Sequence, residues 1–281
     1  MNRHHTIVLF DAVGTVIRPN PGVVAVYHAL GVKHGSRLDV AEIRDRISGS
    51  RRKHFNVGAS AKSLFHRMQS EASQADSDAT PLADSNWLPS SDELECGLWK
   101  RLVFDVFAEL ETRQQLFDDL WEYFAQPQNW EVFPDVAACW GTLRNHGIEI
   151  GLASNFDSRL LRIVESIPTV ADSDYVFCSS QVGFRKPSPL FYRQLELAID
   201  CVSQRPEHSE GQGAVSDAVG SPRIVMVGDD FENDCVAPRL AGWKAIWLNR
   251  NRHDRSVGNS RSANEVATLA EFTQWLLEQL G

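Results

Sequence analysis

The sequence has few cysteines, no long hydrophobic run and no excess of positive charge, and each absence excludes a class of protein. Five cysteines are scattered over 281 residues without a Cys-x-x-Cys pair, so we expect reduced thiols and no disulfide framework. No apolar run approaches the roughly 20 residues that span a bilayer. A net charge of −9 argues against a nucleic-acid or membrane-surface partner.

The composition is that of an ordinary soluble protein. Hydrophobic residues make up 43% of the chain and charged residues 23%. The first apolar strand begins within six residues of the N-terminus, which leaves no room for a signal peptide. We therefore expect a cytoplasmic protein; its oligomeric state cannot be predicted from these features.

The most informative stretch is residues 7–15, Ile-Val-Leu-Phe-Asp-Ala-Val-Gly-Thr. Four consecutive apolar residues followed by turn residues predict a strand that is buried on both faces. Asp11 would then lie at the carboxyl end of this strand, where open α/β sheets bind their ligands. Gly14 allows a sharp turn and a close backbone approach. A carboxylate in this position can act as a nucleophile or bind a hard cation, although the pattern also serves as an ordinary strand-ending turn.

Three later segments strengthen the functional interpretation. Residues 148–157 form an apolar run that ends in Ser154 and Asn155, which could donate to an anionic oxygen at a helix start. Residues 183–189 place Lys186 on a loop just before a helical pattern. Residues 223–234 form another buried strand, and it ends in a cluster of acidic side chains.

Those acidic side chains are close enough in sequence to repel one another. They are Asp229, Asp230, Glu232 and Asp234. Such repulsion is costly without a cationic partner, and Lys186 and a divalent metal ion are the natural candidates.

Strands and helices alternate after residue 131, which predicts a parallel sheet with helical crossovers. The expected strands are 6–10, 148–153, 175–178, 223–227 and 245–248, and a final amphipathic helix covers 266–280. The segment before residue 131 is helical, with helices expected at 22–35, 39–56, 60–70, 91–111 and 113–125. Polar tracts at 70–91, 205–222 and 250–264 predict surface loops.

Four motifs in this order resemble those of the haloacid dehalogenase (HAD) superfamily. They are Asp11-Ala-Val-Gly-Thr15, Ser154-Asn155, Lys186-Pro187, and Gly228-Asp229-Asp230 with Asp234 five residues after Asp229. The resemblance implies an α/β fold with a Rossmann-like parallel sheet core and an inserted α-helical cap. The core would comprise residues 1–18 and 131–281, and the cap residues 19–130.

The resemblance also implies a chemistry, namely hydrolysis of a small phosphorylated substrate with Mg²⁺. Asp11 would be the nucleophile, assisted by Lys186 and Ser154. Gly14, Thr15, Ser154, Asn155 and Lys186 would bind the substrate. Asp11, the main-chain carbonyl of Val13 and Asp229 would hold Mg²⁺, with Asp230 and Asp234 completing its surroundings directly or through water, and Asp234 could pair with Lys186.

Simpler interpretations exist for some of these residues. Ser154 could cap a helix, and this is compatible with substrate contact. Lys186 considered alone is a surface lysine before a proline turn. The basic run from Arg51 to His54 ends a predicted helix, where its charge interacts favourably with the helix dipole. For Trp99, packing is favoured over a role in receiving the substrate.

Val13 departs from the pattern of phosphatases in this superfamily. They usually carry a second aspartate there, which protonates the leaving group and then activates water. Its loss costs about 10²–10⁴ in rate. A substrate with a good leaving group would tolerate this loss. Dehalogenation needs no such proton, but dehalogenases of the family need no metal and lack the acidic fourth motif. A slow phosphatase is therefore favoured over a dehalogenase, and a non-catalytic phospholigand-binding protein is the third alternative.

Overall fold

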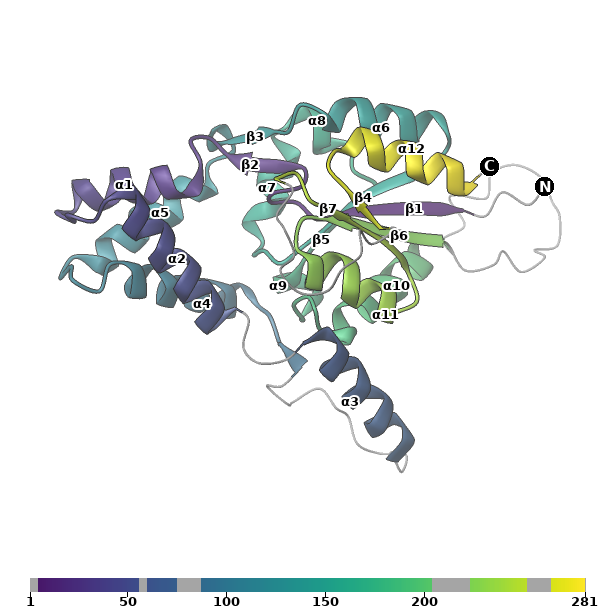
Figure 1. Cartoon of the computed structure of the whole chain (residues 1–281), viewed down its shortest axis with the longest axis horizontal. Coiled ribbons are helices and arrows are strands. Elements are labelled where there is room, and N and C mark those ends of the chain that lie inside the picture. Colours follow the sequence, from purple (N-terminus) through teal and green to yellow (C-terminus); the bar gives the residue numbers. More distant parts are fainter. Residues whose placement is uncertain (1–4, 56–59, 75–86, 204–222, 252–263, 281) are drawn as a thin grey trace.

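A computed structural model of the chain describes residues 5–55, 60–74, 87–203, 223–251 and 264–280. Its centre is a six-stranded sheet in which every recorded pairing is parallel, with the order β5-β4-β1-β6-β7-β8 (Figure 1). This confirms the predicted α/β class and adds β8, which was not predicted. The strands are β1 (Thr6–Phe10), β4 (Glu149–Ser154), β5 (Tyr175–Cys178), β6 (Arg223–Gly228), β7 (Lys244–Leu248) and β8 (Glu265–Val266).

Strand β1 lies between β4 and β6 in this sheet. Phe10, its last residue, pairs with Leu152 on one side and with Val227 on the other. Because all three strands are parallel, their carboxyl ends meet at one edge of the sheet. The residues that follow β1, β4 and β6 are therefore neighbours in space.

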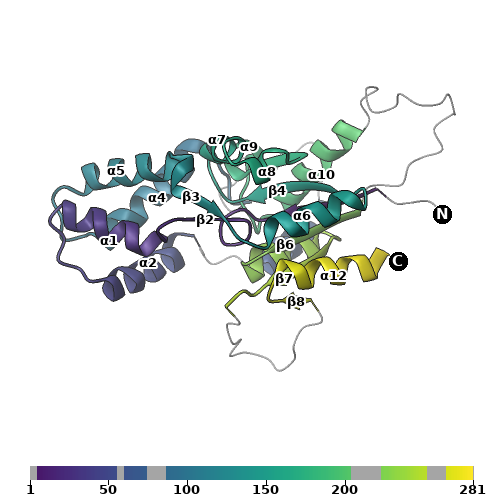
Figure 2. The same cartoon turned by 90° about the horizontal axis from the view of Figure 1, so that it is seen from above.

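The side chains of β1 alternate between two hydrophobic layers, as the period of a strand requires. Val8 and Phe10 belong to one layer, and Ile7 and Leu9 belong to the other. Helices α6 and α12 cover the first face, and α10 and α11 cover the second (Figure 1, Figure 2). The helices of this half are α6 (Val136–Asn145), α7 (Arg159–Glu165), α8 (Pro168–Ala171), α9 (Ser179–Val182), α10 (Pro189–Ser203), α11 (Ala237–Leu240) and α12 (Leu269–Leu280), with a helical turn η5 (Phe231–Val236).

A two-stranded antiparallel ribbon, β2 (Ile17–Pro19) and β3 (Trp130–Val132), connects the sheet to a helical bundle. The bundle consists of α1 (Val23–Lys33), α2 (Val40–His54), α4 (Asp92–Val106) and α5 (Arg113–Ala125), which contact one another and stand beside the sheet (Figure 1). A short turn, η3 (Pro127–Asn129), leads into β3. Helix α4 ends five residues earlier than the predicted range 91–111.

The helix α3 (Ala61–Gln74) leaves this bundle and contacts α10, α11 and η5 instead (Figure 1). Leu64 and Phe65 belong to the hydrophobic cluster of the sheet face that includes Tyr192, and the Phe65 and Tyr192 rings lie 6.3 Å apart. The backbone amide of Ala61 donates to Oε1 of Glu232 at 2.6 Å. The inserted segment therefore has two parts, a bundle and a helix docked on the core, whereas the sequence grouped both as one cap. The division of the chain at residues 18 and 131 stays a prediction.

The three predicted surface loops lie mainly outside the described residues. Of the tract 70–91, α3 covers the start through Gln74, and Pro89 pairs with Phe184 near the end. The tract 205–222 lies wholly outside, as does most of 250–264. Among the helices that the structure describes, none has both the length and the apolar character needed to cross a membrane.

Candidate active site

The edge formed by the ends of β1, β4 and β6 collects the motif residues. Asp11 follows β1 and is buried, and its backbone amide donates to the carbonyl of Val227 at 2.9 Å. The hydroxyl of Ser154, at the end of β4, donates to Oδ1 of Asp11 at 3.0 Å. Oδ2 of Asp11 accepts no hydrogen bond within the described part of the chain. One oxygen of this carboxylate is thus anchored, and the other is available for chemistry.

Lys186 reaches this edge from the loop before α10 and is 3% exposed. Its ammonium group donates to Oδ1 of Asp11 at 2.8 Å, to Oδ1 of Asp234 at 2.6 Å and to the carbonyl of Ala153 at 2.8 Å. These three bonds use all three hydrogens of the group. Lys186 therefore acts on the site as a fixed positive charge.

Burial by itself would lower the pKa of Lys186, but the negative charges of Asp11 and Asp234 outweigh burial, and the pKa is raised. The lysine is therefore protonated at neutral pH and neither gives up nor takes a proton there. Burial raises the pKa of Asp234 well above its usual value, while the charge of Lys186 opposes that shift. The ion pair between them is the interaction that keeps both charges inside the protein.

Asp229 completes a group of three carboxylates with Asp11 and Asp234, whose ligand oxygens all lie within 4.8 Å of one another. With Lys186 as the neighbouring cation, this group carries a formal charge of −2. Loss of hydration, and then the charges of Asp11 and Asp230, raise the pKa of Asp229 to about 7, although this residue is exposed to solvent. Hard oxygen donors that outnumber the neighbouring cation form an environment that suits Mg²⁺.

Two glycines make room for this group. Gly14 has a φ of +95°, and a Cβ built there would lie 2.4 Å from Oδ2 of Asp229. A Cβ built on Gly228 would lie 2.3 Å from Oδ2 of Asp234. The Thr15 hydroxyl contacts Oδ1 of Asp229 at 3.4 Å. Gly14 and Thr15, which the sequence predicted to bind substrate, thus fit around Asp229.

The side chains of Asn155 and Asp230 have hydrogen-bond partners within the protein, and the predicted roles of the Asn155 backbone toward substrate and of Asp230 toward metal stay predictions. The Asn155 side chain accepts from the backbone amide of Lys186 at 2.8 Å and donates to its carbonyl at 2.9 Å, so it holds the lysine loop. Oδ1 of Asp230 accepts from the backbone amides of Glu232 and Asn233, and caps η5. Within the described residues, Asp230 is not part of the carboxylate group.

Asp234 has both of its oxygens engaged. Oδ1 accepts from Lys186 and Oδ2 accepts from the backbone amide of Asp230 at 3.0 Å. Its geometry therefore favours the predicted pairing with Lys186 over direct coordination of a cation.

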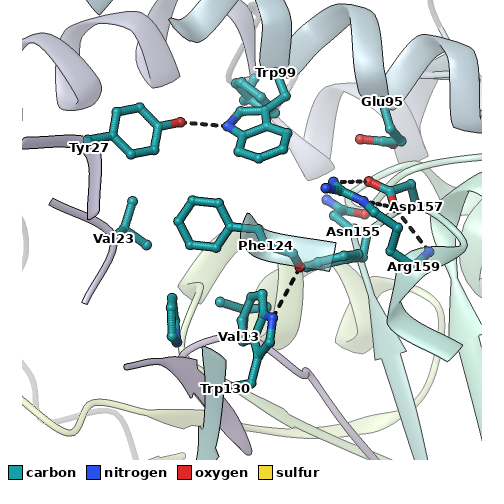
Figure 3. A pocket seen from close by; sticks show the side chains of 13 residues that line it. Val13, Val23, Tyr27, Glu95, Trp99, Phe124, Trp130, Asn155, Asp157 and Arg159 are labelled. Atoms are coloured by element: carbon teal, nitrogen blue, oxygen red, sulfur yellow. Dashed lines mark hydrogen bonds and ion pairs between the residues drawn. The ribbon is translucent and has the colours of Figure 1, made fainter. Parts of the chain in front are cut away.

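Val13 lies beside a cavity of about 200 Å³ between the bundle and the sheet (Figure 3). Aromatic side chains from both parts line it: Tyr27, Phe55, Trp99, Phe124, Trp130 and Phe156. Asn155 lines it too, so the cavity borders the loops that carry Asp11 and Ser154.

The sequence did not predict this cavity. Its lining comes from the turns after β1 and β4, from β2, α1, α4, α5, β3 and the start of α7, and from Phe55 just after α2. Trp99 was assigned to packing, and it does contact Phe117 and Trp121 as well. The eight tryptophans of the chain were the available signal, but their spacing does not indicate which of them share a cavity.

Comparison with known proteins identifies the family of this chain. The chain belongs to the haloacid dehalogenase-like hydrolase family, whose model matches residues 5–242. The chain is similar to haloacid dehalogenase-like hydrolase domain-containing protein 3 of Danio rerio, with 27% identity over 158 residues, which cover 54% of this chain and 57% of that protein. The chain spans about half the length of the curated relatives it matches in this group.

Matches to solved structures extend over nearly all of the chain. A HAD phosphatase from Thermococcus onnurineus matches with a TM-score of 0.51 and 21% identity, and the match covers 96% of this chain and 97% of that one. A defluorinating L-2-haloacid dehalogenase matches with a TM-score of 0.60 and 15% identity, covering 97% and 95%. Both reaction types therefore occur on this fold.

Proposed function

We propose that this hydrolase is a Mg²⁺-dependent phosphatase that acts on a small phosphorylated metabolite through an aspartyl-phosphate on Asp11. The observation that carries the proposal is the group of Asp11, Asp229 and Asp234, which keeps a formal charge of −2 after Lys186 is counted. Displacement of halide by the family's dehalogenases is expected to need no metal, whereas transfer of an anionic phosphoryl group depends on cations around the reacting oxygens.

In the proposed reaction, Oδ2 of Asp11 attacks phosphorus and the bond from phosphorus to the leaving oxygen breaks. The electron pair departs with that oxygen, which takes a proton from solvent because Val13 has none to give. Water then attacks phosphorus, the Asp11–phosphorus bond breaks, and inorganic phosphate and the free carboxylate are released. The fixed charge of Lys186 lowers the repulsion between the Asp11 carboxylate and the phosphate dianion.

The residues present fit Mg²⁺. Asp11, Asp229 and the Val13 carbonyl would hold it, and Asp234 would orient Lys186, since both Asp234 oxygens are already engaged. The carboxylate of Asp230 is engaged in capping η5, so any contribution of this residue would be through water. A bound Mg²⁺ supplies electrostatic stabilisation of the charge on the phosphoryl oxygens.

The test is hydrolysis of an activated phosphate ester with Mg²⁺ and with EDTA, in the wild type and in Asp11→Asn. We expect Mg²⁺-dependent turnover that Asp11→Asn abolishes. Asp45→Asn, which changes an exposed carboxylate on α2, should keep wild-type turnover. Undiminished turnover in Asp11→Asn would contradict the assignment of the nucleophile.

One observation favours a second candidate, a 2-haloacid dehalogenase. Val13 and the apolar cavity beside it offer no proton donor at the position where a phosphatase needs one, and displacement of halide from carbon needs none. Chloride release from 2-chloropropionate that persists in EDTA would favour this candidate over the phosphatase.

A further inference from the structure

The cavity beside Val13 has a continuous aromatic wall. Trp99, Phe124 and Trp130 follow one another along it (Figure 3), with ring centroids 5.5 Å apart for Trp99 and Phe124 and 6.1 Å apart for Phe124 and Trp130. The rings of Trp130 and Phe156 lie 5.9 Å apart, and all three contacts are edge to face. A substrate ring that packs against such a wall gains contact area and edge-to-face attraction. The volume of about 200 Å³ exceeds the roughly 150 Å³ of an apolar cavity that holds benzene.

The charged side chains of the lining already have partners. Arg159 donates to both carboxylate oxygens of Asp157, at 2.7 and 2.6 Å, and its guanidinium lies over the Trp121 ring at 3.4 Å from the centroid. Glu95 pairs with Arg185 and also accepts from Ser90 and Ser179. A charged substrate group in this cavity would therefore be desolvated without an opposite charge to meet it.

Val13 restricts the substrate in a second way. No general acid occupies its position, so the leaving oxygen must depart without a proton from this residue. Phenolate oxygens leave far more readily than alkoxides because the ring delocalises their charge. The missing acid and the aromatic wall therefore call for the same leaving group, and the two observations are independent.

We propose that the substrate is an aryl phosphate monoester with one uncharged aromatic ring system, which binds in this cavity against the aromatic wall while its phosphoryl group meets Asp11. The proposal rests on the phosphatase function above. The products are a phenol and inorganic phosphate, with the phenolate protonated by solvent.

The experiment compares three substrates at saturating Mg²⁺: phenyl phosphate, 3-carboxyphenyl phosphate and acetyl phosphate. Acetyl phosphate, a mixed anhydride, is intrinsically more reactive than the aryl esters but has no ring. Because acetate is a far better leaving group than phenolate, acetyl phosphate serves as the ringless reference, and ring recognition is read from how the ratio of kcat/KM for phenyl phosphate to that for acetyl phosphate changes when the wall is altered. The added carboxylate should lower kcat/KM at least about tenfold relative to phenyl phosphate.

A variant in the wall separates ring recognition from general reactivity. Trp99→Leu should lower the ratio of kcat/KM for phenyl phosphate to that for acetyl phosphate by about tenfold, mainly through a higher KM for phenyl phosphate. Trp275→Leu is the matched control, since Trp275 lies on α12 against Phe272 and should leave the ratio at its wild-type value.

The outcomes distinguish this inference from the function on which it rests. Turnover of acetyl phosphate without detectable turnover of phenyl phosphate, or equal turnover of the carboxylated ring, would overturn the inference and leave the phosphatase standing. Failure to hydrolyse any of the three would overturn both. A ratio that Trp99→Leu does not change, in a variant that unfolds at the wild-type urea concentration, would also overturn the inference.

Discussion

Replacement of Gly14 by alanine tests how the first motif supports the proposed metal site. The new Cβ would lie 2.4 Å from Oδ2 of Asp229, whereas ordinary contacts begin at about 3.4 Å, so the carboxylate must retreat by about 1 Å. Metal sites tolerate about 0.2 Å in their ligand distances. We therefore expect Gly14→Ala to weaken Mg²⁺ binding by about tenfold to a hundredfold, with Asp11 still in place.

The substitution also strains the backbone, because Gly14 has a φ of +95°. This strain costs about 1–2 kcal/mol of unfolding free energy. Gly35 provides the control, since it has a φ of +91° and a Cβ added there would meet nothing within 4 Å. Gly35→Ala should lose the same stability and keep its affinity for Mg²⁺.

The assay is urea unfolding without metal, combined with calorimetric titration of Mg²⁺, for the wild type and both variants. Equal loss of stability with a selective loss of affinity in Gly14→Ala is the expected result. Wild-type affinity in Gly14→Ala would refute the role of Asp229 as a ligand at this distance. Weakened affinity in Gly35→Ala would show that backbone strain alone explains the effect.

Three further predictions concern the same site. Val13→Asp should raise phosphatase turnover by one or more decades, because it restores proton transfer worth about 10²–10⁴; steady-state kinetics that show no gain in the folded variant would mean that another step limits the rate. Because the pKa of Asp229 is raised to about 7, Mg²⁺ must displace a proton from this carboxylate below that pH. The dissociation constant of Mg²⁺ should therefore fall about tenfold from about pH 6 to about pH 8. Calorimetry that shows a constant value would argue against Asp229 as a ligand. Lys186→Met leaves Asp11 and Asp234 buried without their cation and should cost about 3–5 kcal/mol of unfolding free energy in metal-free urea titrations. Adding Asp234→Asn to this variant should restore part of that loss. A loss below about 1 kcal/mol would contradict the buried ion pair.

The predicted site residues differ in how much of the sequence is needed to identify them. Asp11 and Ser154 each end an apolar run, and a parallel sheet necessarily brings such ends to one edge. Charge alone indicated that the acidic cluster needs Lys186 or a metal ion as its partner, and the resemblance to the family supplied the specific pairing of Lys186 with Asp234. Asp230 shows the limit of this reasoning, since the same short acidic stretch supplies both an ion-pair partner and a helix cap.

The alternation of strands and helices, the class of the sheet, and the need of its acidic cluster for a cation can be read from the sequence alone. These features follow from periods of two and 3.6 residues and from charges that must be neutralised, and both are readable within short windows. The place of α3 was decided only by tertiary structure, because Leu64 and Phe65 would suit a cap core as well as the sheet face they cover. The aromatic cavity also depends on tertiary structure. Its lining joins residues from Val13 to Arg159, and volume and ring contacts arise only when distant elements pack together.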